Sequence, residues 1–233
     1  MLTPPTTALG RACVRSVVLA LGLLGAGRGV AANALPVLPR ACETSLALSA
    51  APAYLREDAG VWVLSANGFE QSRPSRNHFT CVVNRDHPLV LKPTCYDAEG
   101  TRTILPKVVW FGEELLAGKP IDRLREAEQA GFASGRFERA ARPGVAYMLS
   151  RYNRPLNRQT GTLGFFPPHV MFYAPDLRNE DIGHDMRFYD PAQPLPMIAY
   201  GGPHGYMIMI SDDGQSRSRD DLDHSCPDWV FDE

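Results

Sequence analysis

The cysteines place the strongest single constraint on how this chain can fold. Cys13 lies near the N-terminus, and the other four, Cys42, Cys81, Cys95 and Cys226, are spread over the rest of the 233 residues. Their spacings match no zinc-binding pattern, so we expect two disulfides formed in an oxidising compartment. Four cysteines allow three pairings. We favour Cys81–Cys95, which closes a short loop worth about 3 kcal/mol on the chain-entropy model, with Cys42–Cys226 tying the two ends to the body.

The N-terminal segment is typical of a secretory signal. Arg11 and Arg15 precede an apolar run over residues 17–26, and small residues follow, which is the order of a basic region, an apolar region and a cleavage site. The run is shorter than the roughly 20 residues that a membrane-spanning helix needs. We therefore predict a signal peptide over residues 1–32 and an exported protein, periplasmic or secreted, with no membrane segment after cleavage.

Charge argues against a nucleic-acid-binding protein. Removing residues 1–32 takes away three arginines and no acidic residue, which leaves 24 − 3 = 21 basic and 26 acidic side chains, a net charge of −5. The basic residues are scattered, whereas nucleic-acid binding needs a basic patch. We expect a small molecule or a component of the cell envelope as partner, and the sequence predicts no cofactor.

The apolar pattern predicts an α+β fold, with an antiparallel sheet meander and two or three helices packed on one face. Short apolar runs predict strands, at residues 61–64, 79–83, 145–150, 165–175, 197–200 and 206–210. Pro106 and Pro120 each predict the start of a helix, because proline is favoured in the first turn, and residues 49–56 predict a third. We divide the chain into the signal peptide, an N-terminal lead-in (33–44), one globular domain (45–210) and an acidic C-terminal tail (211–233).

The proline-flanked segment 165–175 contains the histidine of greatest chemical interest. We expect the segment to be a buried strand, with His169 near its start as either a hydrogen-bonded core side chain or the polar point of a pocket. A hydrolase hypothesis pairs His169 with Ser150 across the sheet and adds His204 as a further catalytic candidate. The Gly-x-Ser-x-Gly turn of many hydrolases is missing, so this hypothesis lacks its most specific support.

Imidazoles and carboxylates also suggest a metal site. His169 and His184 are candidate ligands together with Asp181 and Asp185, and residues three apart can share one face of a helical turn. No His-Glu-x-x-His motif occurs, so a polar loop is the simpler interpretation.

Asp97 and Glu99 form a second pair of carboxylates, close to Cys95. Such a pair can bind a cation or perform acid–base chemistry. A surface turn is the commoner explanation, since aspartate and glycine are turn formers.

A binding hypothesis depends on aromatic side chains, which often line ligand pockets. The candidates are Tyr147, Phe172, Tyr173 and Tyr206. Because no catalytic motif is present, we place a non-enzymatic ligand-binding or structural factor of the envelope ahead of a hydrolase or a metal-dependent enzyme.

Several segments together resemble a family of exported bacterial proteins of unassigned function. The segments are residues 79–81, 95–100, 142–150, 167–175 and 179–183. The resemblance covers most of residues 45–210 and implies export and a single domain. It implies no activity and no catalytic residue.

Overall fold

The computed structural model describes residues 1, 35–157, 160–188, 190 and 192–231. Residues Ala32–Glu233 form one compact unit. The predicted signal peptide and its cleavage site lie outside the described residues, apart from Met1. Within the described ranges, no helix is long and apolar enough to cross a membrane.

An eight-stranded sheet with the order β2-β1-β3-β4-β5-β6-β8-β7 forms the centre of the unit. Its strands are β1 (Gly60–Ser65), β2 (Gly68–Arg73), β3 (Thr80–Asn84), β4 (Lys92–Tyr96), β5 (Val145–Met148), β6 (His169–Tyr173), β7 (Met197–Ala199) and β8 (Tyr206–Ile210). All neighbours pair antiparallel except β1 and β3, which run parallel. The predicted early meander is therefore interrupted once, because the β1–β2 hairpin turns outward to the sheet edge and β3 pairs on the other side of β1.

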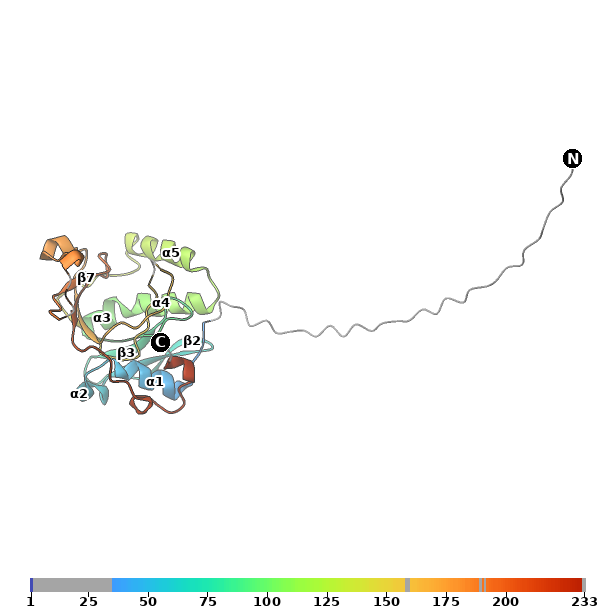
Figure 1. Cartoon of the computed structure of the whole chain (residues 1–233), viewed down its shortest axis with the longest axis horizontal. Coiled ribbons are helices and arrows are strands. Elements are labelled where there is room, and N and C mark those ends of the chain that lie inside the picture. Colours follow the sequence, from blue (N-terminus) through green and yellow to red (C-terminus); the bar gives the residue numbers. More distant parts are fainter. Residues whose placement is uncertain (2–34, 158–159, 189, 191, 232–233) are drawn as a thin grey trace. The chain divides into compact units, whose positions relative to one another are not determined.

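Helices cover one face of the sheet, as the sequence predicts. These are α3 (Ala98–Thr103), α4 (Leu105–Leu116) and α5 (Ile121–Ala133), and Figure 1 shows α4 and α5 together above the sheet. Val108, Phe111 and Leu115 of α4 are buried in the first core, at the three- and four-residue spacing of one helix face. The α+β class and the largely antiparallel sheet are confirmed.

A helix that the sequence analysis did not predict, α1 (Arg40–Ser49), covers the opposite face, followed by the single turn α2 (Ala53–Arg56). It buries Cys42, Leu46 and Ala47 against β1, β3 and β4 in a second core. The N-terminal lead-in thus ends in an element of the body rather than in a connector.

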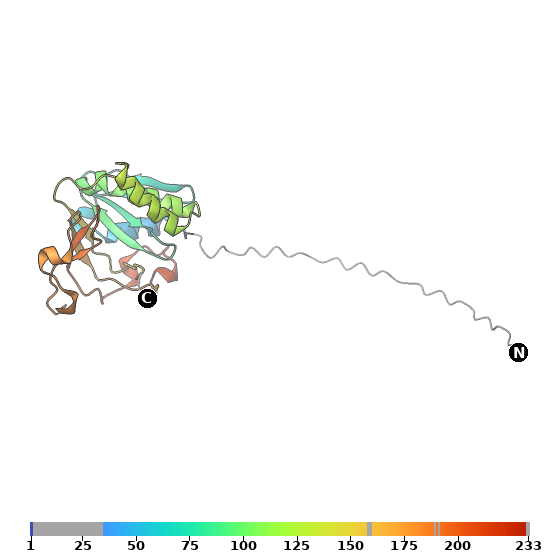
Figure 2. The same cartoon turned by 90° about the horizontal axis from the view of Figure 1, so that it is seen from above.

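Both favoured disulfides, Cys42–Cys226 and Cys81–Cys95, are confirmed. Cys81 and Cys95 are directly opposite each other on β3 and β4. The other disulfide joins α1 to the C-terminal segment, which runs beside α1 in Figures 1 and 2.

The C-terminal segment is more ordered than the predicted tail. It contains the 3₁₀ turns η3 (Arg219–Asp221) and η4 (Asp228–Val230), and it buries Leu222 and Val230 in the second core. Residues 211–231 are therefore part of the body.

A fully buried ion pair lies on the face of the sheet that α1 covers. Arg85 Nη2 lies 2.6 Å from Glu43 Oε2, and both side chains are 0% exposed. Burial raises the pKa of Glu43, and the charge of Arg85 opposes that effect. Removing one partner would leave the other charge buried and unpaired. The pair therefore holds α1, which carries Glu43, against Arg85, which directly follows β3.

We expect the two disulfides to differ in their contribution to stability. Cys42–Cys226 spans a sequence separation of 184 and Cys81–Cys95 one of 14, which corresponds to about 5 and about 3 kcal/mol on the chain-entropy model. The double variant Cys42→Ser, Cys226→Ser should therefore unfold at a lower denaturant concentration than Cys81→Ser, Cys95→Ser. Equal midpoints in urea titrations would contradict this order.

Candidate functional site

A pocket of about 580 Å³ lies on the helix-covered face, between α4, α5, the inner strands and the β7–β8 hairpin. Its volume falls in the range of small-molecule sites, about 300–1,000 Å³. The elements that form it are far apart in sequence: its lining runs from Asn84, at the end of β3, to Ile208 in β8. The sheet order thus gathers residues from most of the domain.

Aromatic rings supply much of the pocket wall. They are Tyr96, Phe111, Phe132, Phe166, Tyr200 and Tyr206. Burial raises the pKa of the Tyr96 and Tyr206 hydroxyls. Both tyrosines are therefore neutral at ordinary pH.

Five charged side chains form a connected row along the pocket. Asp86 pairs with Lys92 at 2.8 Å and with Arg125 at 3.3 Å, while Glu128 pairs with Lys107 at 2.9 Å and with Arg125 at 3.6 Å. All five line the pocket. Three cations against two carboxylates give the row a net charge of +1.

Lys92 stays protonated within this row. Burial opposes its charge, but the charge of Asp86 and its hydrogen bond to Lys92 favour the protonated form, and the pKa of Lys92 is raised above its usual value. The side chain therefore acts as a fixed cation and not as a nucleophilic amine.

His169 lines the pocket and is only 2% exposed. Its Nδ1 lies 2.8 Å from the Pro167 carbonyl, so Nδ1 carries the proton and donates, and Nε2 has a free lone pair. Burial lowers the pKa of His169 to about 4, against the effect of this hydrogen bond. His169 is a neutral side chain of the pocket.

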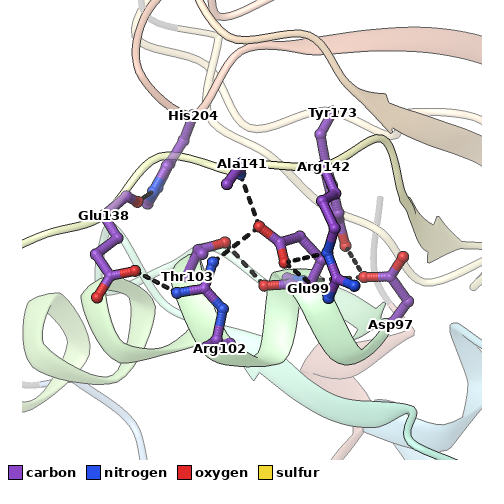
Figure 3. Close-up of polar contacts among 10 residues, drawn as sticks. Asp97, Glu99, Arg102, Thr103, Glu138, Ala141, Arg142, Tyr173 and His204 are labelled. Carbon is purple, nitrogen blue, oxygen red and sulfur yellow. Dashed lines mark hydrogen bonds and ion pairs between the residues drawn. The ribbon is translucent and has the colours of Figure 1, made fainter.

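His204 enters the pocket from the β7–β8 hairpin. Its Nε2 donates to the Glu138 carbonyl at 2.7 Å, as Figure 3 shows, and its ring packs edge-on against Phe132, with centroids 4.6 Å apart. Burial, helped by the charge of Lys107, lowers the pKa of His204 to about 4. Its buried Nδ1 has no hydrogen-bond partner among the described residues.

Asn153 adds a third polar group, 2% exposed. Its Nδ2 donates to the Phe166 carbonyl at 3.4 Å, and its buried Oδ1 lacks a partner within the described part of the chain. A buried acceptor left without a donor costs about 1–3 kcal/mol. Such a cost in a pocket wall points to a ligand as the missing donor.

Ser150 does not pair with His169. Its hydroxyl accepts a hydrogen bond from Ser49 of α1 at 2.7 Å and another from the Tyr152 N–H at 3.2 Å, and it does not line the pocket. The hydrolase pairing was wrong because β5 ends at Met148, and the chain then turns toward the α1 side.

The metal candidates do not come together. Asp181 accepts from the Arg178 N–H at 2.8 Å at the start of the 3₁₀ turn η1 (Asn179–Ile182), and Asp185 pairs with Arg187 at 2.5 Å, whereas His169 lies in the pocket. In the ranges that the structure describes, no group of three or more His, Cys, Asp or Glu side chains is placed to hold an ion. His184, between these two carboxylates in sequence, therefore belongs to no ligand set that the described residues form.

Of the four aromatic binding candidates, Tyr206 alone lines the pocket. Tyr147 packs against Phe79 on the opposite face, with ring centroids 5.8 Å apart. Phe172 is 40% exposed on that same side of β6, since it alternates with the inward Met171 and Tyr173. Tyr173 points into the first core but bonds to Asp97 instead of reaching the pocket.

The sequence suggested the Asp97–Glu99 pair as a cation or acid–base site. In the structure both carboxylates accept hydrogen bonds from backbone N–H groups, and Figure 3 shows their surroundings. Asp97 begins α3 by accepting from the Gly100 N–H at 2.9 Å, and it also accepts from the Val145 N–H at 2.8 Å and from the Tyr173 hydroxyl at 2.7 Å. Glu99 accepts from the Ala141 N–H at 2.7 Å, and this bond is the main cause of its lowered pKa. Both carboxylates are thus committed to structure.

The sequence analysis missed Lys92, Arg125 and Asn153. Lys92 follows the apolar pair Val90-Leu91 and starts a strand that is otherwise buried. A lysine in such a strand is rarely buried unless it is paired, but this signal becomes visible only once the strand itself, which contains Pro93, is recognised. Asn153 carries no comparable local signal.

Comparison with protein-family models, with curated proteins and with solved structures found no match.

We expect Asp97→Ala to destabilise the fold strongly. The change removes an N-cap acceptor, worth about 0.5–2 kcal/mol, and leaves the Val145 N–H without its side-chain acceptor, which costs about 1–3 kcal/mol more. The Tyr173 hydroxyl keeps the Val145 carbonyl as an acceptor at 2.9 Å. A loss of about 3 kcal/mol in the free energy of unfolding is expected in urea titrations. Asp181→Ala, which removes a similar but exposed cap, is the matched control and should cost less than half as much.

The acid sensitivity of the protein should depend on His169. Its folded-state pKa of about 4 lies below the ordinary 6.5, so the unfolded chain takes up the proton first, and stability is lost as the pH falls from 6.5 toward 4. At about 1.4 kcal/mol per pKa unit, this loss amounts to roughly 3 kcal/mol. His169→Asn keeps a donor for the Pro167 carbonyl but cannot be protonated, so it should lose correspondingly less stability between these two pH values. Equal losses in urea titrations would contradict the prediction.

Proposed function

We propose that this protein is an exported binding protein for a small molecule, which it holds in the pocket between α4, α5 and the sheet. The observation that carries the proposal is Asn153, a 98% buried residue of the pocket lining whose Oδ1 has no donor among the described residues. A buried acceptor of this kind calls for a partner, and a ligand in the pocket would supply the donor.

The chemistry of the pocket favours binding over catalysis. No serine or cysteine lines it among the residues that the structure describes. His169 and His204 each donate to a backbone carbonyl, so neither has the carboxylate partner that orients a catalytic base. With pKa values of about 4, both are weak bases at neutral pH.

Two disulfides support the export part of the proposal. Disulfides form and persist in oxidising compartments and are rare in the cytosol. The apolar N-terminal run behind two arginines supports it as well, since it has the order of a secretory signal.

A pocket-filling variant tests the proposal. Ala199 of β7 lines the pocket opposite Tyr206, so Ala199→Trp should place a large ring in the cavity. A compound present at about 100 times its Kd stabilises the folded state by about 2.7 kcal/mol, and we expect at least one member of a polar metabolite collection to raise the thermal midpoint of the parent protein but not that of Ala199→Trp.

Val170→Trp is the matched control, because Val170 is half-buried on β6 and does not line the pocket. The control should retain the thermal shift. The proposal fails if no compound shifts the parent protein, or if the shifts survive Ala199→Trp.

A further inference from the structure

Two hydrogen-bond acceptors lie in the pocket wall, next to Phe166. Asn153 and His169 flank Phe166: Asn153 Nδ2 donates to the Phe166 carbonyl, and the rings of Phe166 and His169 lie with centroids 4.9 Å apart. Nδ1 of His169 is used by Pro167, so Nε2 and Asn153 Oδ1 remain as acceptors. A ligand that satisfies them must donate, through hydroxyl or amide groups.

The charged row comes from other elements. Whereas the acceptors require a ligand that donates hydrogen bonds, the row requires one that carries a negative charge. Lys92 lies on β4, Lys107 on α4 and Arg125 on α5, and the two carboxylates Asp86 and Glu128 leave one positive charge uncompensated. The chain beyond residue 32, this row included, is acidic, with a net charge of −5. A row with one excess positive charge in an acidic protein favours an anionic group over a cation.

We propose that the ligand is a small organic anion that bears hydroxyl groups, as a sugar acid or a sugar phosphate does. Its hydroxyls donate to Asn153 and His169, and its anionic group pairs with Lys92 and Arg125. The aromatic rings that line the pocket pack against the C–H faces of a sugar ring. This inference rests on the proposed function and adds the chemical class of the ligand.

Titration calorimetry with four probes separates the parts of this recognition. Glucuronate carries a carboxylate, glucose 6-phosphate carries a phosphate, and glucuronamide and glucose carry neither charge. At least one anion should bind, and the neutral probes should bind at least about tenfold more weakly, the usual size of a lost charge-assisted hydrogen bond. The stronger of the two anions identifies the charged group that the pocket prefers.

Two substitutions in the charged row should act in opposite directions. Lys92→Met removes a cation and should weaken binding of the preferred anion about tenfold, whereas Asp86→Asn removes a competing carboxylate and should tighten it. A purely structural role for the row predicts weaker binding in both variants, since each breaks the Lys92–Asp86 pair. Arg123→Met is the matched control, because Arg123 is 71% exposed on α5 and does not line the pocket.

Asn153→Leu tests the acceptors. It should weaken the preferred anion and its neutral counterpart by the same factor, because the lost bond is to a hydroxyl in both ligands. Circular dichroism and the thermal midpoint establish that each variant is folded before it is titrated.

The results separate this inference from the proposed function. If neither anion binds at millimolar concentration while a neutral or cationic compound gives a shift that Ala199→Trp abolishes, the ligand class is wrong and the pocket is still a binding site. If the neutral probes bind as tightly as the anions, or if Lys92→Met and Asp86→Asn change affinity in the same direction, the ligand class is also wrong. If no compound gives a shift that depends on Ala199, both proposals fail.

Discussion

The carboxylate of Asp97 connects the elements on which the pocket depends. It ends β4, begins α3, and receives hydrogen bonds from the Val145 N–H of β5 and from the Tyr173 hydroxyl of β6. Burial raises the pKa of Tyr173 far above its usual range, so the hydroxyl keeps its proton and donates at every accessible pH. Because α4 follows α3 directly, this side chain anchors the start of the helical segment that leads into α4, and the buried face of α4 then packs in the first core.

The polar groups of the pocket are each held in one protonation state near neutral pH. Its histidines are held neutral by burial and oriented by backbone carbonyls, and its Lys92 is held charged by Asp86. Fixed acceptors and fixed charges suit recognition, whereas acid–base catalysis requires a group that changes its protonation state near the working pH.

Local patterns in the sequence predict the elements that carry one strong signal. The apolar runs identified β1, β3, β5, β6 and the β7–β8 hairpin, and Pro106 and Pro120 marked α4 and α5. The misses have physical causes: α1 follows a proline-containing segment that reads as a connector, and β4 contains Pro93, which argues against a strand within a sheet. Of the pocket residues, His169 was singled out because it stands alone in an apolar run. Asn153 and Arg125 were not, because only the sheet order and the α4–α5 packing bring them to His169.

The two faces of the sheet differ in what they contain. The disulfides and the fully buried ion pair lie on the face opposite the pocket. Both disulfides lie in the second core, and the fully buried Glu43–Arg85 pair ties α1 to the chain just beyond β3. The first core borders the cavity, which forgoes the close packing of an ordinary interior. Buried polar atoms without a partner among the described residues occur on both sides: Asn153 Oδ1 and His204 Nδ1 at the pocket, and Glu43 Oε1 and Arg85 Nε beside α1. A face closed by covalent cross-links can compensate for an open one, because cross-links restrict the unfolded chain whichever face they occupy. Both cross-links are of a kind that forms and persists in oxidising compartments.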